Sequence, residues 1–161
     1  PRSRGLGDVY KRQRNSTHTS TQALQLDFWT AFVEYCDSVG TTLSLRSPGP
    51  RHWYSIAVGR SNFEISLILN SFEGTIRVEL YIRGKDAKKN FQQLEAHKQT
   101  IESELGCPVE WKELPDQQDS RIVLAKEANY QDREDWESQH SWLKKWAENF
   151  HKVFSPIIKK I

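Results

Sequence analysis

Two stretches in which apolar residues recur at every second position constrain the fold of this 161-residue chain most strongly. They cover residues 62–69 and 75–82, and the apolar positions are Phe63, Ile65, Leu67, Leu69, Ile76, Val78, Leu80 and Ile82. A period of two is typical of strands that bury one face and leave the other polar. The short segment 70–74 between the two stretches predicts a turn, so the sequence predicts an antiparallel pair.

Other segments complete the predicted architecture. We expect further strands at residues 53–58, 109–113 and 120–125, and turns at 59–61 and 114–119. Apolar residues recur at steps of three and four over 24–39, 86–105 and 135–154, which predicts three amphipathic helices. The order α-β-β-β-α-β-β-α predicts an α+β two-layer sandwich, in which three helices cover a mostly antiparallel five-stranded sheet.

The same patterns predict the core and the ends of the helices. Asp86 suits the N-cap and Gly106 the C-terminal stop of the second helix, whose apolar seam also contains Lys98. Pro156 is expected to end or kink the third helix. His140 lies on the apolar stripe of that helix, which indicates a packed core histidine. The expected core comprises Phe28, Phe32, Phe63, Ile65, Leu67, Val78, Leu80, Phe91, Leu94, Ile101, Trp111, Ile122, Leu143 and Phe150.

The beginning of the chain differs in character from the rest. Residues 3–13 (SRGLGDVYKRQ) resemble a translated sequencing adapter, so we expect residues 1–13 not to be native. Residues 14–22 (RNSTHTSTQ) are polar and aperiodic, as in a linker, and 23–161 form the single α+β domain. The absence of methionine indicates a fragment of a longer, metagenomic gene product.

Composition narrows the classes of function. The chain carries a formal charge of +2, and residues 1–13 alone contribute +3, so the remainder is weakly acidic and offers no global attraction for nucleic acid. No apolar run is long enough to cross a bilayer. Cys36 and Cys107 have neither metal-binding nor disulfide spacing, which favours reduced thiols and a cytoplasmic location. No motif predicts a cofactor or a metal site.

Several strings resemble one known family, in order and in spacing: FWTAFVEY (28–35), GPRHWYSIAVGRSNFEISL (49–67), RVELYI (77–82), FQQLEAHKQTIESELG (91–106), EWKELP (110–115), SRIVL (120–124) and SWLKKWAENFHKVF (141–154). Over about residues 24–158 the chain resembles the bacterial and archaeal domain of unknown function 4268 family. The resemblance implies no assigned activity and no catalytic residues. It implies a C-terminal module, often preceded by a domain of the restriction-endonuclease (PD-(D/E)XK) type, so the expected partner is a missing N-terminal nuclease-like domain of the same chain.

An acidic site is one candidate for chemistry. Glu64 and Glu79 lie on adjacent predicted strands and point to one face, as two carboxylates that bind Mg²⁺ would. The lysine of a nuclease motif is absent after Glu79, and Lys98 lies on a helix seam that faces the opposite side of the sheet. We therefore favour a solvated or ion-paired polar face over a nuclease site.

Cations supply two weaker candidates for binding DNA or another anion. Arg77, Tyr81, Arg83 and Arg121 project from the polar face, where Glu64, Glu79 and Lys112 give it mixed charge. The second candidate joins the first meander turn to the start of the second helix, and it comprises His52, Trp53, Arg60, Ser61, Lys85, Lys88 and Lys89. For both, we favour an ordinary solvated surface.

The sequence thus predicts an uncharacterised accessory domain, the non-catalytic C-terminal module of a restriction-endonuclease-like protein, which contributes nucleic-acid or partner binding. Two alternatives stay open. One is a diverged metal-dependent nuclease, which would make the domain an enzyme. The other is a structural or dimerisation module that uses the Trp-rich last helix. Trp142, Trp146 and Val153 lie off the main stripe of that helix, where they either wrap the core or form a contact patch for the missing domain.

Overall fold

The structure is a computed structural model, and it describes residues 18–161. The adapter-like segment and residues 14–17 of the expected linker lie outside the described residues. The elements follow one another as α2 (Ser20–Val39), β1 (Trp53–Ala57), β2 (Phe63–Asn70), β3 (Thr75–Ile82), α3 (Ala87–Glu95), α4 (Lys98–Leu105), β4 (Glu110–Lys112), β5 (Ser120–Glu127), the 3₁₀-helix η1 (Arg133–Asp135) and α5 (Trp136–Ile158).

The five strands form one sheet in the order β1-β2-β3-β5-β4, and each neighbouring pair is antiparallel. β1, β2 and β3 make the expected meander. The chain then passes through α3 and α4 to the far edge, where β4 lies, and β5 returns between β4 and β3. The α+β class and the five-stranded antiparallel sheet are therefore confirmed.

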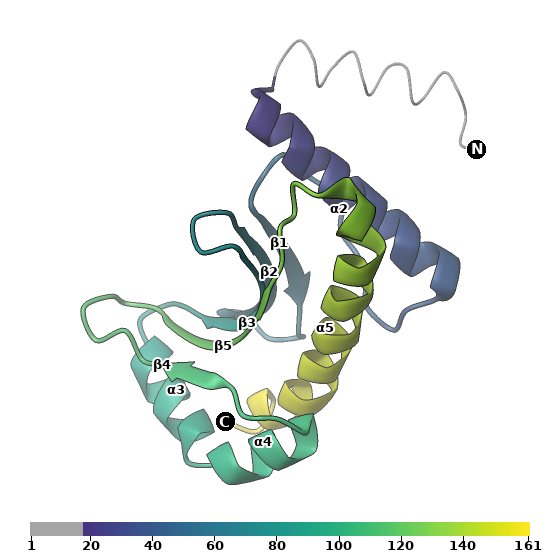
Figure 1. Cartoon of the computed structure of the whole chain (residues 1–161). Helices are drawn as coiled ribbons and strands as arrows, with labels where there is room; N and C mark the ends of the chain where they lie inside the picture. Colours follow the sequence, from purple (N-terminus) through teal and green to yellow (C-terminus); the bar gives the residue numbers. More distant parts are fainter. Residues whose placement is uncertain (1–17) are drawn as a thin grey trace.

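The helices lie on one side of a bent sheet (Figure 1). α5 packs against β2 and β3, α3 packs against β3 and β5, and α2 and α4 both pack against α5. The apolar positions of the two alternating strands are buried beneath them. Every expected core residue is buried except Trp111, which is partly exposed and whose indole Nε1 donates to Glu102 Oε2 at 3.0 Å.

The first helix begins earlier than the apolar period suggests. α2 starts at Ser20, so three residues of the expected linker are helical. Thr19 accepts a hydrogen bond from the backbone of Gln22, whose side chain accepts one from the backbone of Thr19. This capping box satisfies N–H groups that the first turn would otherwise leave unpaired, so polar residues extend the helix.

The second predicted helix is two helices, and this changes the position of Lys98. The chain tightens after α3, where the His97 N–H donates to the Leu94 carbonyl at 2.9 Å, and α4 begins at Lys98. Ile101 and Leu105 remain buried. The break turns Lys98 out of the expected seam, and it is exposed. Asp86 lies at the N-cap without a side-chain capping bond, whereas Gly106 ends α4 in the left-handed conformation, as expected.

The last helix confirms one expectation and corrects another. His140 is 3 % exposed and its Nε2 lies 3.1 Å from the Phe28 carbonyl oxygen, as expected of a packed histidine. Pro156, however, does not end the helix, because it lies inside α5, which continues to Ile158. The lost hydrogen bond falls in the final turn, where Arg60 Nη1 donates to the Ile158 carbonyl at 2.6 Å and the Ile158 side chain is buried.

Candidate binding face on the sheet

Among residues 18–161, no helix covers the side of the sheet opposite the helices, which we call the uncovered face (Figure 1). The register places its side chains in three rows that run across the strands, beside a shorter row, Asn70–Thr75–Glu127, next to the turn between β2 and β3. The three rows are Trp53–Ile68–Arg77–Ala125, Ser55–Ser66–Glu79–Val123–Glu110 and Ala57–Glu64–Tyr81–Arg121–Lys112. The structure therefore brings the predicted polar residues of β2, β3 and β5 together.

Glu79 lies at the centre of the uncovered face and is only 2 % exposed. Arg121 Nη1 donates to its Oε1 at 2.6 Å, and Arg77 Nη1 lies 3.9 Å from its Oε2. Its neighbours in the middle row, Ser66 and Val123, are buried as well. Burial of a carboxylate is costly unless it is paired and hydrogen-bonded, so the two guanidiniums offset the cost of burying Glu79.

The same arginines are held by a second layer of carboxylates. Arg77 also pairs with Glu73 in the turn before β3, and Arg121 Nη2 lies 3.5 Å from Asp119 Oδ2. The Arg121 guanidinium lies over the Tyr81 ring, 4.3 Å from its centroid. Burial, together with a hydrogen bond to Asp119, raises the pKa of Tyr81, so its hydroxyl is protonated at neutral pH.

The borders of the uncovered face are more exposed than its centre. Arg83 Nη1 forms an ion pair with Glu64 Oε1 at 3.1 Å, and Lys112 Nζ lies 3.9 Å from Glu110 Oε2. At the β1 border Trp53 is 43 % exposed. His52 packs edge-on against the Trp53 ring, and the Arg51 guanidinium lies 5.7 Å from the centroid of that ring.

Arg60 contacts the end of α5 and the ring of Phe63. Besides the Ile158 carbonyl, its Nη1 donates to the carbonyl of Ile161, and its guanidinium lies 5.5 Å from the Phe63 ring centroid. The cation therefore caps the carboxyl end of α5, where backbone carbonyls concentrate negative charge. Ser61, beside it in the turn, is exposed.

Lys88 is likewise bound within the fold, whereas Lys85 and Lys89 are exposed. The Lys88 ammonium donates to the carbonyls of Glu113, Leu114 and Asp119 and to Ser120 Oγ. These acceptors surround it at the turn between β4 and β5, so Lys88 holds that turn against α3. The cluster of cations expected around the meander turn and the start of α3 is therefore not one free site.

The structure brings together only two of the three residues considered for a nuclease site, Glu64, Glu79 and Lys98. Glu64 and Glu79 do share the uncovered face, but each carboxylate forms an ion pair with an arginine. Lys98 begins α4, which packs against α5 on the helical side. Within the described part of the chain, no three His, Cys, Asp or Glu side chains lie together as metal ligands would.

Ser66 was expected on this polar face together with Glu64, whereas Val123, Glu73 and Asp119 were not identified from the sequence as parts of it. Ser66 and Val123 follow from alternation once the register is known, since they lie opposite Glu79 on the two neighbouring strands. Glu73 and Asp119 lie in turns, outside the alternating runs, so periodicity carries no signal for them.

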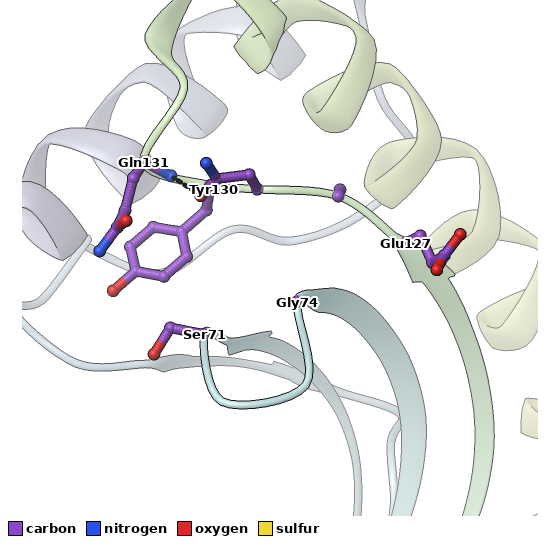
Figure 2. A pocket seen from close by; sticks show the side chains of 7 residues that line it. Ser71, Gly74, Glu127, Tyr130 and Gln131 are labelled. Carbon is purple, nitrogen blue, oxygen red and sulfur yellow. Dashed lines mark hydrogen bonds between the residues drawn. The ribbon is translucent and has the colours of Figure 1, made fainter.

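A hollow of about 580 Å³ lies between the β2–β3 turn and the segment that follows β5. Figure 2 shows Tyr130, Gln131, Ser71 and Gly74 around it. Its backbone groups are largely engaged, since the Ala128 N–H donates to the Gly74 carbonyl at 3.0 Å and the Gln131 N–H to Asn129 Oδ1 at 3.0 Å. A further hollow of about 430 Å³ lies between α4 and the end of α5.

The fold is thus an α+β domain in which helices cover one side of an antiparallel sheet. The other side, which is rich in ion-paired arginines, is left uncovered. The chain belongs to the family described as Domain of unknown function (DUF4268), whose model matches residues 24–158. No curated protein and no solved structure matches the chain. None of the helices within residues 18–161 combines the length and the apolar character that spanning a membrane requires.

Proposed function

We propose that this domain is a non-catalytic accessory module that binds a protein partner through the uncovered face. The observation that carries the proposal is the composition of that face. It presents Trp53, Tyr81, Arg77 and Arg121 around a buried, paired carboxylate. Tryptophan, tyrosine and arginine are the residue types that dominate the energetics of protein interfaces.

The charges of the face favour a protein over a nucleic acid. Arg77, Arg83 and Arg121 each form an ion pair with a carboxylate of the same face or its adjoining turns. A polyanion gains affinity by replacing counterions with protein cations, and cations that are already paired contribute little to that exchange. Alternating positive and negative groups instead complement a protein surface of opposite pattern and fix its register.

The partner we propose is a nuclease-like domain of the restriction-endonuclease type, encoded in the same chain upstream of this module. The support for it is the family resemblance, because members often carry this domain at the C-terminus of such proteins. The module would then position that domain or its substrate, and the chemistry would belong to the nuclease-like domain.

Charge-reversal variants distinguish a protein partner from a nucleic acid. The nuclease-like domain of a two-domain family member is titrated into this chain by calorimetry. The variant Arg83→Glu with Lys112→Glu alters the border of the uncovered face. The variant Lys85→Glu with Lys89→Glu makes the same change in net charge at exposed positions near the start of α3.

We expect the first double variant to weaken binding at least about tenfold, which is 1.4 kcal/mol, and the second to leave it unchanged. Equal weakening by both variants, or no binding by the unaltered chain, would overturn the proposal. The same two variants are tested against a DNA duplex, where non-specific attraction would make their effects similar.

A cleavage assay tests the alternative of a diverged nuclease. The chain is incubated with Mg²⁺ or Mn²⁺ and with single- and double-stranded DNA. We expect no cleavage that depends on Glu79. Metal-dependent cleavage that disappears in Glu79→Gln while the protein stays folded would establish an enzyme and contradict the non-catalytic role.

A further inference from the structure

The two edges of the sheet differ in how they are protected. β4 has three residues, carries Glu110 and Lys112, and is flanked by Pro108 and Pro115. β1 has five residues, Trp53–Ala57, with neither a charged side chain nor a proline. Folded proteins prevent strand addition with short edge strands, charges and prolines. β4 is therefore protected by its shortness and its two charged side chains, whereas β1 is longer and carries no charge; a proline lies within three residues of each strand.

The free edge of β1 also presents backbone groups that have no partner strand. The Leu69 N–H donates to the His52 carbonyl at 2.8 Å, so His52 and Leu69 form a hydrogen-bonded pair. Such pairs alternate along an antiparallel ladder, so the N–H and C=O groups of Trp53, Ser55 and Ala57 point away from β2. Within residues 18–161, β1 pairs with β2 alone.

We propose that β1 pairs antiparallel with β1 of a second copy of this chain, with the two-fold axis at Ser55. In this register Ser55 lies opposite the partner's Ser55, and Trp53 lies opposite the partner's Ala57. All three outward N–H groups and all three outward C=O groups of each copy then have partners. The two sheets join into one continuous sheet, in an interface of the kind that closes a dimer.

The side chains of the edge are self-complementary in this register. The largest of the three, Trp53, meets the smallest, Ala57, and both are exposed in the single chain. Two small serine side chains meet at the axis. The exposed Arg51 lies beside Trp53 and thereby approaches the partner's Glu64, which follows Ala57 in its cross-strand row. Size and charge therefore both favour a second copy over an unrelated strand.

Sedimentation tests the association. We expect the full chain to show a concentration-dependent species of twice its 18.8 kDa mass. Ser55→Lys places two like charges opposite each other at the axis and should restore the monomer. Ser55→Thr adds bulk but no charge, keeps strand propensity and should still dimerise. Circular dichroism verifies that both variants are folded.

Cysteine scanning tests the register in a Cys107→Ser background, with the buried Cys36 left in place. Ser55→Cys should form a disulfide with itself under mild oxidation, because opposite residues of a hydrogen-bonded pair lie about 5.5 Å apart. Trp53→Cys and Ala57→Cys should cross-link to each other when mixed, but neither should cross-link to itself.

A chain that stays monomeric at every concentration, or a Ser55→Lys variant that dimerises like the unaltered chain, would overturn the proposal. Self-linkage of Trp53→Cys in place of Ser55→Cys would contradict the register. Failure of dimerisation can be told apart from failure of partner binding, because the first is tested at Ser55 and the second at Arg83 and Lys112.

Discussion

His140 illustrates how burial determines the charge of a single side chain. The ring is enclosed by Phe28, Phe32 and Trp136, and burial lowers its pKa from 6.5 to about 4. The hydrogen bond with the Phe28 carbonyl opposes this shift but is the smaller effect. The imidazole is therefore neutral in the folded protein at neutral pH, with its Nε2–H donating to that carbonyl.

This histidine should make the fold sensitive to mild acid. The unfolded chain binds a proton near pH 6.5 and the folded chain only near pH 4, so stability falls as the pH falls through that window. The loss amounts to about 3 kcal/mol. Urea unfolding at several pH values measures it, and His140→Gln, which keeps a donor but does not titrate, should flatten the profile between those limits. An unchanged profile in the variant would contradict this reading.

Glu79 should contribute more to stability than Glu64, although both are acidic residues of the uncovered face. Glu79→Gln leaves Arg77 and Arg121 with one carboxylate each, and we expect a loss of about 1–3 kcal/mol. Glu64→Gln disrupts a pair with the half-exposed Arg83 and should cost below about 1 kcal/mol. Urea unfolding compares them. Equal losses would show that burial of the Glu79 pair has no energetic consequence.

The positions of these residues were predictable from the sequence, but their partners were not. Alternation alone places Arg77, Glu79 and Tyr81 on one face. The pairing of Glu79 with Arg121 depends on β5 lying beside β3, which sets Val123 opposite Glu79 and Arg121 opposite Tyr81. Periodicity within a strand contains no information about which strand becomes its neighbour.

At the scale of elements, Lys88 connects α3 to the turn between β4 and β5. Its ammonium lies 2.7 Å from each of the Leu114 and Asp119 carbonyl oxygens, and Ser120 Oγ donates to the Glu113 carbonyl at 2.7 Å. In the turn between β4 and β5, Lys88 thus supplies hydrogen bonds to carbonyls that would otherwise depend on water. This use of Lys88 explains why a cation near a helix start need not indicate an anion site.

Lys88→Met should therefore loosen the turn. The apolar stem is kept, but the carbonyls lose a charged donor, and we expect a loss of about 1–3 kcal/mol. Hydrogen exchange over residues 113–120 should accelerate, because local opening becomes easier. The matched control is Lys89→Met at an exposed position, with an effect within about 0.5 kcal/mol. Similar effects of the two substitutions on exchange would contradict the role assigned to Lys88.

The break between α3 and α4 is a feature that the spacing of apolar residues does not predict. Apolar residues at 87, 91, 94, 101 and 105 keep helical spacing through the break, so they predict one helix. Only Lys98, a charge on an apolar seam, conflicts with that prediction. The structure resolves the conflict by tightening the backbone at Ala96 and His97, which exposes Lys98 while Ile101 and Leu105 stay buried.

At the scale of the whole molecule, one-sided strands and one-sided helices define the architecture. Each strand that has a buried face needs a helical cover, and the amphipathic helices supply it on a single side. The order of the strands follows from no local pattern, because α3 and α4 could deliver β4 to either edge. The uncovered face is thus predictable as a polar surface of mixed charge, whereas the particular ion pairs that balance its charges emerge only from the assembled sheet.

That balance leads to a prediction about polyanions. If the arginines of the uncovered face are neutralised by their carboxylates, removing one carboxylate should release one cation for phosphate contact. Glu64→Gln should therefore make the dependence of DNA affinity on salt steeper by about one in log–log slope. Fluorescence anisotropy with a labelled duplex, between about 50 and 200 mM salt, measures that slope.

The control for this prediction is Glu137→Gln, which makes the same change in net charge at an exposed position in the first turn of α5. If global charge decided DNA affinity, both variants would steepen the slope equally, and the ion pairs of the face would be irrelevant. If Glu64 neutralises Arg83, Glu64→Gln should steepen the salt dependence of DNA affinity more than Glu137→Gln does. A steep slope in the unaltered chain that Glu64→Gln leaves unchanged would mean that the arginines already engage phosphates, and a nucleic acid would then replace a protein as the preferred partner. Comparing variants of the full chain cancels the contribution of residues 1–13, which carry a net +3 in every variant.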